Sequence, residues 1–154
     1  MDDLENTLHA MQDKIDTLKK SASSKQARIK EVDELLRMVD YYKSGKPATD
    51  KLKSIRFEKS RQKYKAEHDD ELRTFYMAER KLKPYFKDGK LPITAWRKER
   101  AQLEQEYRDI QTELSPLHAD AKKLWAIHYN IYEVQHEQER QNTELRQKKQ
   151  EIEH

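Results

Sequence analysis

The chain contains no cysteine, only two glycines and four prolines among 154 residues, and only 8% aromatic residues. The lack of cysteine excludes disulfides, thiolate-ligated clusters and cysteine nucleophiles, and permits a reducing compartment. Two isolated glycines cannot form the glycine-rich loops that cradle phosphates or the sharp turn that presents a serine nucleophile. No apolar run could cross a bilayer and no secretory signal follows Met1. We therefore expect a cytoplasmic protein that is not an enzyme, needs no cofactor and has no membrane partner.

Charged residues make up 40% of the chain and hydrophobic residues 34%, with a formal net charge of +3. This composition is too charged for a globule with a thick core, yet the aliphatic residues are too regularly spaced for a disordered chain. Long amphipathic helices satisfy both conditions, because each buries a narrow stripe and exposes the rest. The composition predicts an all-α fold in one domain or one extended module.

Apolar residues recur every seven positions from Thr94 to the C-terminus, on two tracks offset by four residues. Such tracks lie on one side of a helix, as in the seam of a coiled coil or a helical hairpin. The first track holds Trp96, Leu103, Ile110, Leu117, Leu124, Ile131, Leu145 and Ile152, and the second holds Tyr107, Leu114, Ala121 and His128.

The N-terminal segment carries a similar seam, which only Lys25 interrupts. The sequence leaves open whether the two seams pair within one chain or between chains. The residues of this seam are Leu4, Leu8, Met11, Ile15, Leu18, Ala22, Ile29, Val32, Leu36 and Val39.

Two glycine–proline stretches predict the breaks between helices. Gly45 would end the first helix and Pro47 would prevent its continuation, and Gly89 and Pro92 would act in the same way later in the chain. We expect three long helices that form an elongated antiparallel hairpin or coiled-coil bundle. The predicted segments are residues 1–44, 49–88 and 94–154, the last kinked near Pro116.

Basic residues cluster between residues 43 and 65, where the sequence has nine lysines and arginines and only two acidic residues. A second cluster surrounds the second break. Such clusters bind phosphate backbones without reading sequence, and Phe57 and Tyr64 could stack on unpaired bases. The alternative is a solvated helix face. The candidate nucleic-acid-binding residues are Lys51, Lys53, Arg56, Lys59, Arg61, Lys63, Lys87, Lys90, Arg97 and Lys98.

Metal-binding patterns are incomplete. His136 begins a zinc-protease-like motif, but Arg140 stands where the second histidine is needed. His68 and Glu71 share a helix face, but no second pair lies opposite them, so a solvated acidic turn is the simpler interpretation. His128 fits a polar residue that sets the register of the seam. Trp96 and Trp125 are expected to be packing anchors.

The middle of the chain resembles a known family. The order Lys63-Tyr64, Glu67-His68-Asp69-Asp70-Glu71-Leu72, Leu82, Gly89-Lys90-Leu91-Pro92-Ile93 and Trp96-Arg97-Lys98-Glu99-Arg100 is similar to the helical, coiled-coil C-terminal region of relaxase (mobilization) proteins. These enzymes nick the DNA of conjugative and mobilizable elements such as plasmids. The resemblance covers roughly residues 34–136. The nuclease motifs of the family, a nucleophilic tyrosine and a metal-binding histidine cluster, have no counterpart here, so no catalytic residue is carried over.

Two hypotheses follow. The first is a non-catalytic helical module of a mobilization system that contacts the DNA backbone or partners in the transfer complex. The second is a coiled-coil scaffold that self-associates or binds partner helices through its seams and does not bind nucleic acid. An enzyme ranks far behind both.

Overall fold

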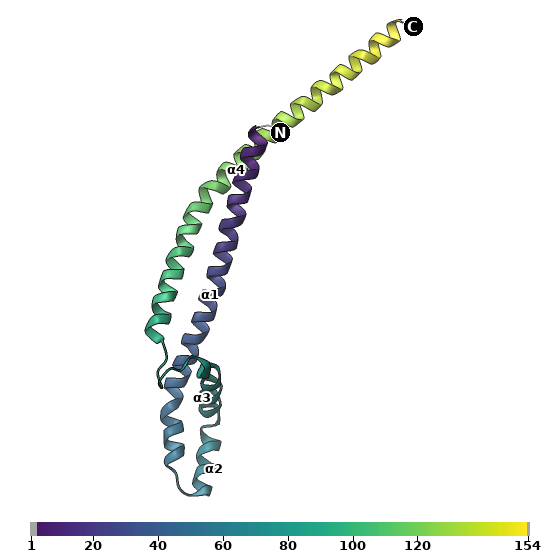
Figure 1. Ribbon diagram of the computed structural model, residues 1–154. Helices are drawn as coiled ribbons and strands as arrows, with labels where there is room; N and C mark the ends of the chain where they lie inside the picture. The colour runs from purple at the N-terminus through teal and green to yellow at the C-terminus, as the bar shows by residue number, and fades with distance from the viewer. Residues whose placement is uncertain (1–2, 154) are drawn as a thin grey trace. The chain divides into compact units, whose positions relative to one another are not determined.

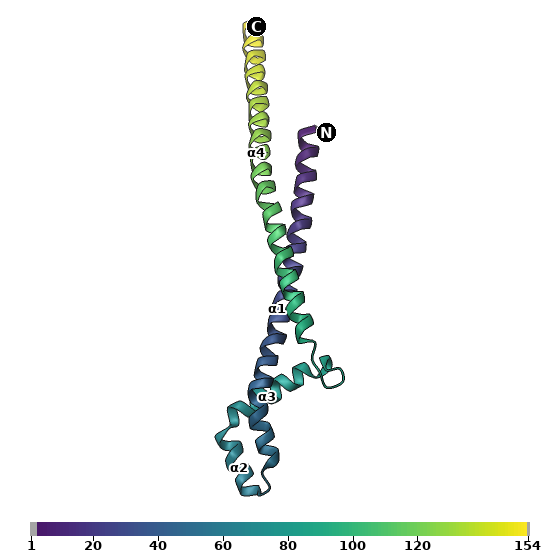
Figure 2. The same cartoon turned by 90° about the vertical axis from the view of Figure 1, so that its left-hand side faces the viewer.

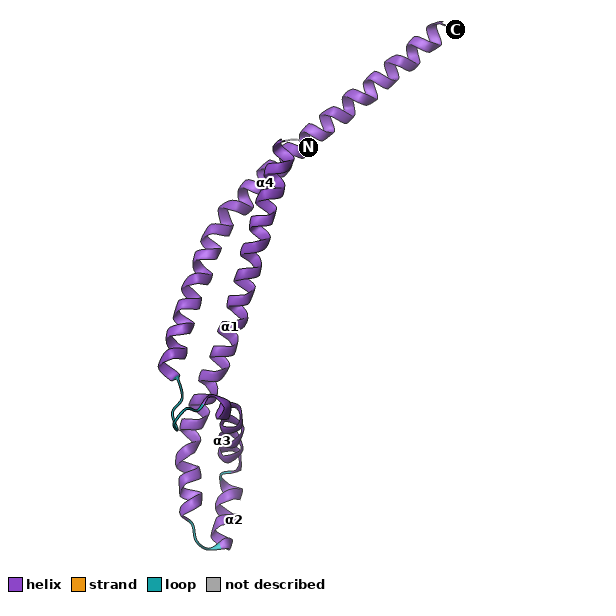
Figure 3. Ribbon diagram, viewed as in Figure 1, coloured by secondary structure: helices purple, strands orange, loops and turns teal. Residues whose placement is uncertain are grey.

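The structure, a computed structural model, describes residues 3–153 and the side chains to residue 152, and is helical almost throughout (Figures 1 and 3). The described part contains no strand, which confirms the all-α prediction. None of its helices is long and apolar enough to span a membrane. The outermost residues of the predicted segments, Met1, Asp2 and His154, lie outside the described part. The elements are α1 (Asp3–Ser54), α2 (Glu58–Glu67), α3 (Asp69–Leu82), the 3-10 helix η1 (Lys83–Tyr85) and α4 (Ile93–Glu153).

The chain divides into two compact units. Unit 1 contains Met1–Ala22 and Arg108–His154, and unit 2 contains Ser23–Tyr107, so α1 and α4 each contribute to both. In unit 1, Lys14 Nζ lies 3.4 Å from Glu113 Oε1, and His128 Nε2 lies 3.2 Å from Glu5 Oε1. The earlier residue of α1 therefore meets the later residue of α4, and the two helices run antiparallel.

The predicted seams supply the buried positions of unit 1. These are Leu8, Ile15 and Ala22 on α1, and Ile110, Leu114 and Ala121 on α4. The seams therefore pair within one chain. Residues 129–152 of α4 are all exposed, and this segment continues past the described start of α1 (Figures 1 and 2). The expectation that Trp125 is a packing anchor is wrong, since its side chain is 44% exposed.

In unit 2, charged pairs join α1 to the first turns of α4. Arg28 donates to both carboxylate oxygens of Glu99, with Nε–Oε1 2.6 Å and Nη2–Oε2 3.2 Å. Lys25 Nζ donates to Glu106 at 2.8 Å, and Arg100 donates to Asp33. Lys25, which interrupts the apolar seam, thus has a partner across the interface.

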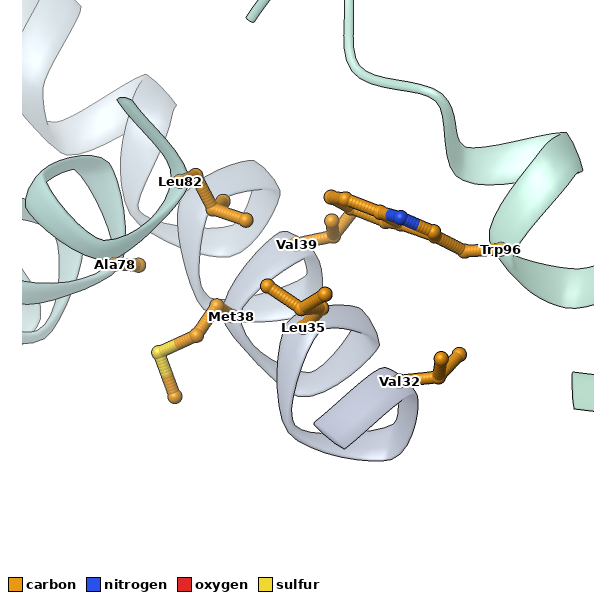
Figure 4. Packing of buried hydrophobic residues seen from close by; sticks show 7 residues of the cluster. All are labelled: Val32, Leu35, Met38, Val39, Ala78, Leu82 and Trp96. Atoms are coloured by element: carbon orange, nitrogen blue, oxygen red, sulfur yellow. The ribbon is translucent and has the colours of Figure 1, made fainter. Parts of the chain in front are cut away.

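The larger core of unit 2 is built by three helices. Trp96 of α4 lies over Val39 and Leu35 of α1, and Ala78 and Leu82 of α3 pack on the same stretch of α1 (Figure 4). Trp96 is only 5% exposed, as expected for a packing anchor. The remaining members of the cluster are Val32 and Met38.

The predicted helix end at Ser44–Pro47 is wrong, because α1 continues through it to Ser54. Gly45 is instead a contact point: a Cβ at this position would lie 2.7 Å from Phe75 Cβ and 3.3 Å from the carbonyl oxygen of Glu71 on α3. The exposed Pro47 removes one helical hydrogen bond. Burial of the neighbouring Ala48, Thr49 and Leu52 offsets that loss. Thr49 Oγ1 donates to the Gly45 carbonyl oxygen at 3.1 Å, so the buried hydroxyl is satisfied.

The predicted single helix over residues 49–88 is also wrong, because this region contains the end of α1, then α2, α3 and η1. His68 separates α2 from α3, and both its backbone N–H (3.0 Å) and its Nδ1 (3.1 Å) lie within hydrogen-bonding distance of the Tyr64 carbonyl oxygen. The described part therefore has four α-helices where three were predicted. α4 begins one residue before the predicted start and continues through Pro116, so the proline does not break it.

The second predicted break is confirmed. Lys87 and Lys90 exchange two backbone hydrogen bonds of 2.9 Å, and the residues between them, Asp88 and Gly89, have φ of 53° and 74°. A two-residue turn with two left-handed residues favours the Asp-Gly pair. This turn reverses the chain between η1 and α4.

We expect Gly45→Ala to destabilise the protein, although alanine normally stabilises a helix interior relative to glycine. The added methyl group meets Phe75 Cβ, and overpacking of this kind costs about 1–3 kcal/mol. Urea denaturation followed by circular dichroism measures the effect. Ser44→Ala, at the exposed neighbouring position, is the matched control and should be neutral or slightly stabilising. A G45A protein as stable as the wild type would contradict the close approach of α3.

The Arg28–Glu99 pair predicts a pH-dependent stability. The hydrogen bond from Arg28 lowers the pKa of Glu99, whose ordinary value is 4.5. A lowered pKa in the folded state stabilises the fold above pH 4.5, and the contribution disappears as the pH falls through the folded value. Glu99→Gln should therefore cost up to about 1 kcal/mol at neutral pH, because the pair is partly exposed.

The difference between E99Q and wild type should shrink towards zero in urea denaturation series taken from neutral pH to below 4.5. Glu31→Gln is the control. Glu31 contacts Arg28 from within α1, so this pair does not join α1 to another helix. A difference that stays constant with pH would show that the carboxylate charge of Glu99 does not contribute.

Candidate nucleic-acid interface

The connection between α1 and α2 forms a sharp corner, which we define as residues 51–63. Leu52 is buried with Ala48, Tyr64 and Leu72, and Ile55 packs against this cluster. The Ile55 N–H donates to the Leu52 carbonyl oxygen at 3.2 Å. Because these apolar side chains fill the inside of the corner, the polar residues beside them lie on its outer surface.

The cations of the corner are solvent-exposed. Lys51, Lys53, Arg56, Lys59 and Lys63 are exposed and Arg61 is half-buried. Between residues 51 and 65, seven lysines and arginines accompany a single acidic residue, Glu58. Within residues 3–153, none of the candidate residues at the corner forms an ion pair with an acidic side chain.

The interface cations of unit 2 behave differently. Arg28, Lys25 and Arg100 each contact a carboxylate across the α1–α4 interface. The hydrogen bonds that Arg28 donates to Glu99 and Glu31 raise its pKa, and the bond that Arg100 donates to Asp33 raises the pKa of Arg100. The hydrogen bonds from Lys25 and then Gln102 lower the pKa of Glu106. These cations stabilise the fold, whereas those of the corner remain available to a ligand.

The two aromatic residues proposed to stack on bases differ in accessibility. Tyr64 is 8% exposed, its ring stacks on His68 with centroids 4.0 Å apart, and Lys51 Nζ lies 5.6 Å from its centroid. Tyr64 therefore belongs to the core, and its expected stacking role is wrong. Phe57 is 77% exposed and precedes the first residue of α2 in an extended conformation.

The remaining candidate cations lie at the other end of α3. Lys87 and Lys90 flank the Asp-Gly turn, and Arg97 and Lys98 follow in the first turns of α4. All four are exposed and, within residues 3–153, lack an ion-pair partner. The C-terminal part of α2 and the 14 residues of α3 lie between the corner and this turn along the chain. The candidate residues thus form two patches, one at the α1–α2 connection and one at the connection that precedes α4, and Figure 2 shows these two connections apart from each other.

The histidine-containing motifs are not gathered into a metal centre. Within the described residues, no group of three His, Asp or Glu side chains is placed to hold a metal ion. Asp69 Oδ2 contacts Arg73 at 3.1 Å, and Glu71 lines a shallow groove with Tyr41 and Gly45. His136 contacts Tyr132 and Glu139 on its own helix, and the seam residue His128 contacts Glu5.

Sequence reasoning missed the break at residues 55–57, which creates the corner and exposes Phe57. No glycine or proline marks this break. The start of α3 did carry a signal: Asp69, Asp70 and Glu71 lie in its first turn, where acidic residues favour a helix N-terminus.

We compared the chain with models of known protein families, with curated proteins and with solved structures, and found no match in any of the three.

Proposed function

We propose that this chain is a non-catalytic helical module of a plasmid or conjugative-element mobilization (relaxase) system, and that it contacts the DNA backbone. The observation that carries the proposal is the uncompensated charge of the corner. The cations of the α1–α4 interface have acidic partners, while those at residues 51–63 have none within the described residues. Exposed lysines and arginines without acidic partners are suited to neutralise phosphates and release their counterions.

The second patch extends the same proposal. Lys87, Lys90, Arg97 and Lys98 would contact phosphates other than those that the corner contacts. The candidate residues lie at helix ends, in a tight turn and on exposed helix faces. They are not presented together on one recognition helix. We therefore expect binding that depends on charge and not on base sequence.

Charge reversal at the corner tests the proposal. Arg56→Glu, Lys59→Glu and Lys63→Glu in one chain should weaken binding to a labelled duplex about tenfold or more, whatever its sequence. The slope of log affinity against log salt should also become shallower, by roughly 0.9 for each phosphate that the variant no longer neutralises. Fluorescence anisotropy at several salt concentrations measures both quantities.

The matched control reverses three exposed cations of unit 1, Lys19, Lys20 and Lys148, and changes the net charge equally. It should leave affinity nearly unchanged, because it alters only charge outside the two patches. Equal losses of affinity in the two triple variants would mean that only net charge matters, and an unaffected corner variant would exclude the corner.

A second candidate function, a self-associating scaffold without nucleic-acid binding, is favoured by the apolar surface of α4. Two exposed stripes lie on α4 where the seam approaches the start of α1, and one of them includes the seam residue Ile131. Each stripe has helical i, i+4, i+7 spacing and continues the buried α1–α4 interface of unit 1. The aromatic stripe is Trp125, Tyr129 and Tyr132, and the aliphatic stripe is Ile127, Ile131 and Val134.

A second copy of the chain is the partner that fits this surface. Lys122 and Lys123 precede the stripes, and Glu133, Glu137 and Glu139 follow Ile131. Antiparallel pairing of two copies of α4 about Ile131 places Lys123 of one copy level with Glu139 of the other. Parallel pairing would place like charges together, which is destabilising.

We expect light scattering to give a concentration-dependent mass above the 18.6 kDa of one chain. Ile131→Asp should shift the protein towards the monomer, because it places a charge in the centre of the contact. Gln111→Asp, an equal charge change at an exposed site on α4, should leave the mass unchanged. A constant monomer mass at all concentrations would exclude self-association through α4.

A further inference from the structure

Phe57 is a large apolar side chain in the corner, immediately before the first residue of α2. It is 77% exposed, the most of any aromatic residue in the described part, while its neighbour Ile55 packs inward. Its carbonyl oxygen accepts the Arg61 N–H at 2.9 Å, which ties the backbone of Phe57 to the first turn of α2. The ring is therefore presented to solvent from an ordered backbone.

The surroundings of the ring are basic. Lys53 and Arg56 precede it, Lys59 and Arg61 follow it, and the only nearby acid is Glu58. The aromatic residue that follows the corner, Tyr64, is buried, with Lys51 over its ring and His68 stacked against it. One aromatic face is thus available, with cations before and after it along the chain.

We propose that Phe57 stacks on an unpaired nucleobase, so that the corner binds single-stranded nucleic acid in preference to duplex. This inference rests on the proposed DNA contact and names the form of nucleic acid that the corner selects. Every base has a π-face, so one ring suffices without sequence preference, while the adjacent cations hold the phosphates on either side. A base inside a duplex is already stacked on its neighbours and offers no free face.

An anionic membrane surface is the competing partner for a phenylalanine among cations. Peripheral membrane binding requires several apolar side chains on one face, or an acyl chain together with basic residues. The corner exposes one large apolar side chain, because Leu52, Ile55 and Tyr64 face inward. A single ring is sufficient to stack on one base, but it is insufficient to anchor the protein in a lipid layer. The structure therefore favours nucleic acid as the partner.

The test compares Phe57→Ala, Phe57→Leu and Phe57→Trp in the full chain. Binding is measured to a labelled single strand and to a duplex of the same length. Removal of the aromatic face in F57A and F57L should weaken single-strand binding about fivefold or more and leave duplex binding within about twofold. F57W, which restores a ring, should bind like the wild type.

A second readout reports stacking directly. Fluorescence of 2-aminopurine placed in the single strand should be quenched on binding wild type and F57W, and not on binding F57A. Tyr41→Ala removes another exposed aromatic residue, on α1 and outside the corner, and should leave single-strand affinity unchanged. Circular dichroism should show all variants folded, because most of the Phe57 side chain lies in solvent.

The outcomes separate the two proposals. Salt-dependent binding to both DNA forms that is insensitive to Phe57 would overturn the stacking inference and leave the backbone contact intact. Wild type that binds neither form at low salt would overturn both. Binding to phosphatidylserine vesicles that requires Phe57, with DNA binding unaffected by its removal, would assign the ring to a lipid surface and overturn the inference.

Discussion

The close approach of α3 to Gly45 is the constraint on which the corner-bearing part of unit 2 depends. Only a residue without a Cβ permits Phe75 and the Glu71 carbonyl group to lie so near the axis of α1. That contact, with the buried face of Ala48 and Leu52, keeps α1 helical through Pro47 and carries it to Ser54. The position of the basic corner therefore depends on the packing of α3 against α1.

The chain uses its cations in two ways. Arg28 and Arg100 approach carboxylates across the α1–α4 interface, where each pair also fixes the alignment of the two helices. A shift of one helix past the other would separate these pairs and remove their contribution, which is modest because the side chains are partly exposed. The cations of the corner have no such partners in the described residues, although Lys51 and Lys53 belong to the same helix as Arg28.

The two ends of the α4 seam differ in burial although they share the same seven-residue spacing. Seven-residue spacing continues from Trp96 to Ile152, yet Trp96 is buried and Ile152 is exposed. Periodicity predicts which side of a helix faces a partner, and it carries no information on whether a partner is there.

Much of the fold was predictable because it depends on local spacing. The sequence by itself determined the all-α class, the apolar sides of α1 and α4, the Asp88–Gly89 turn and the clustering of basic residues. Tertiary structure alone decided that Gly45 is a packing contact and that the helix is interrupted at Ile55–Phe57. It also decided that Tyr64 is buried while Phe57 is exposed. A glycine can end a helix, or it can lie inside one and allow a second helix to pack closely against it. The outcome at Gly45 depends on its contact with Phe75, which is 30 residues away in the chain and therefore outside any local sequence pattern.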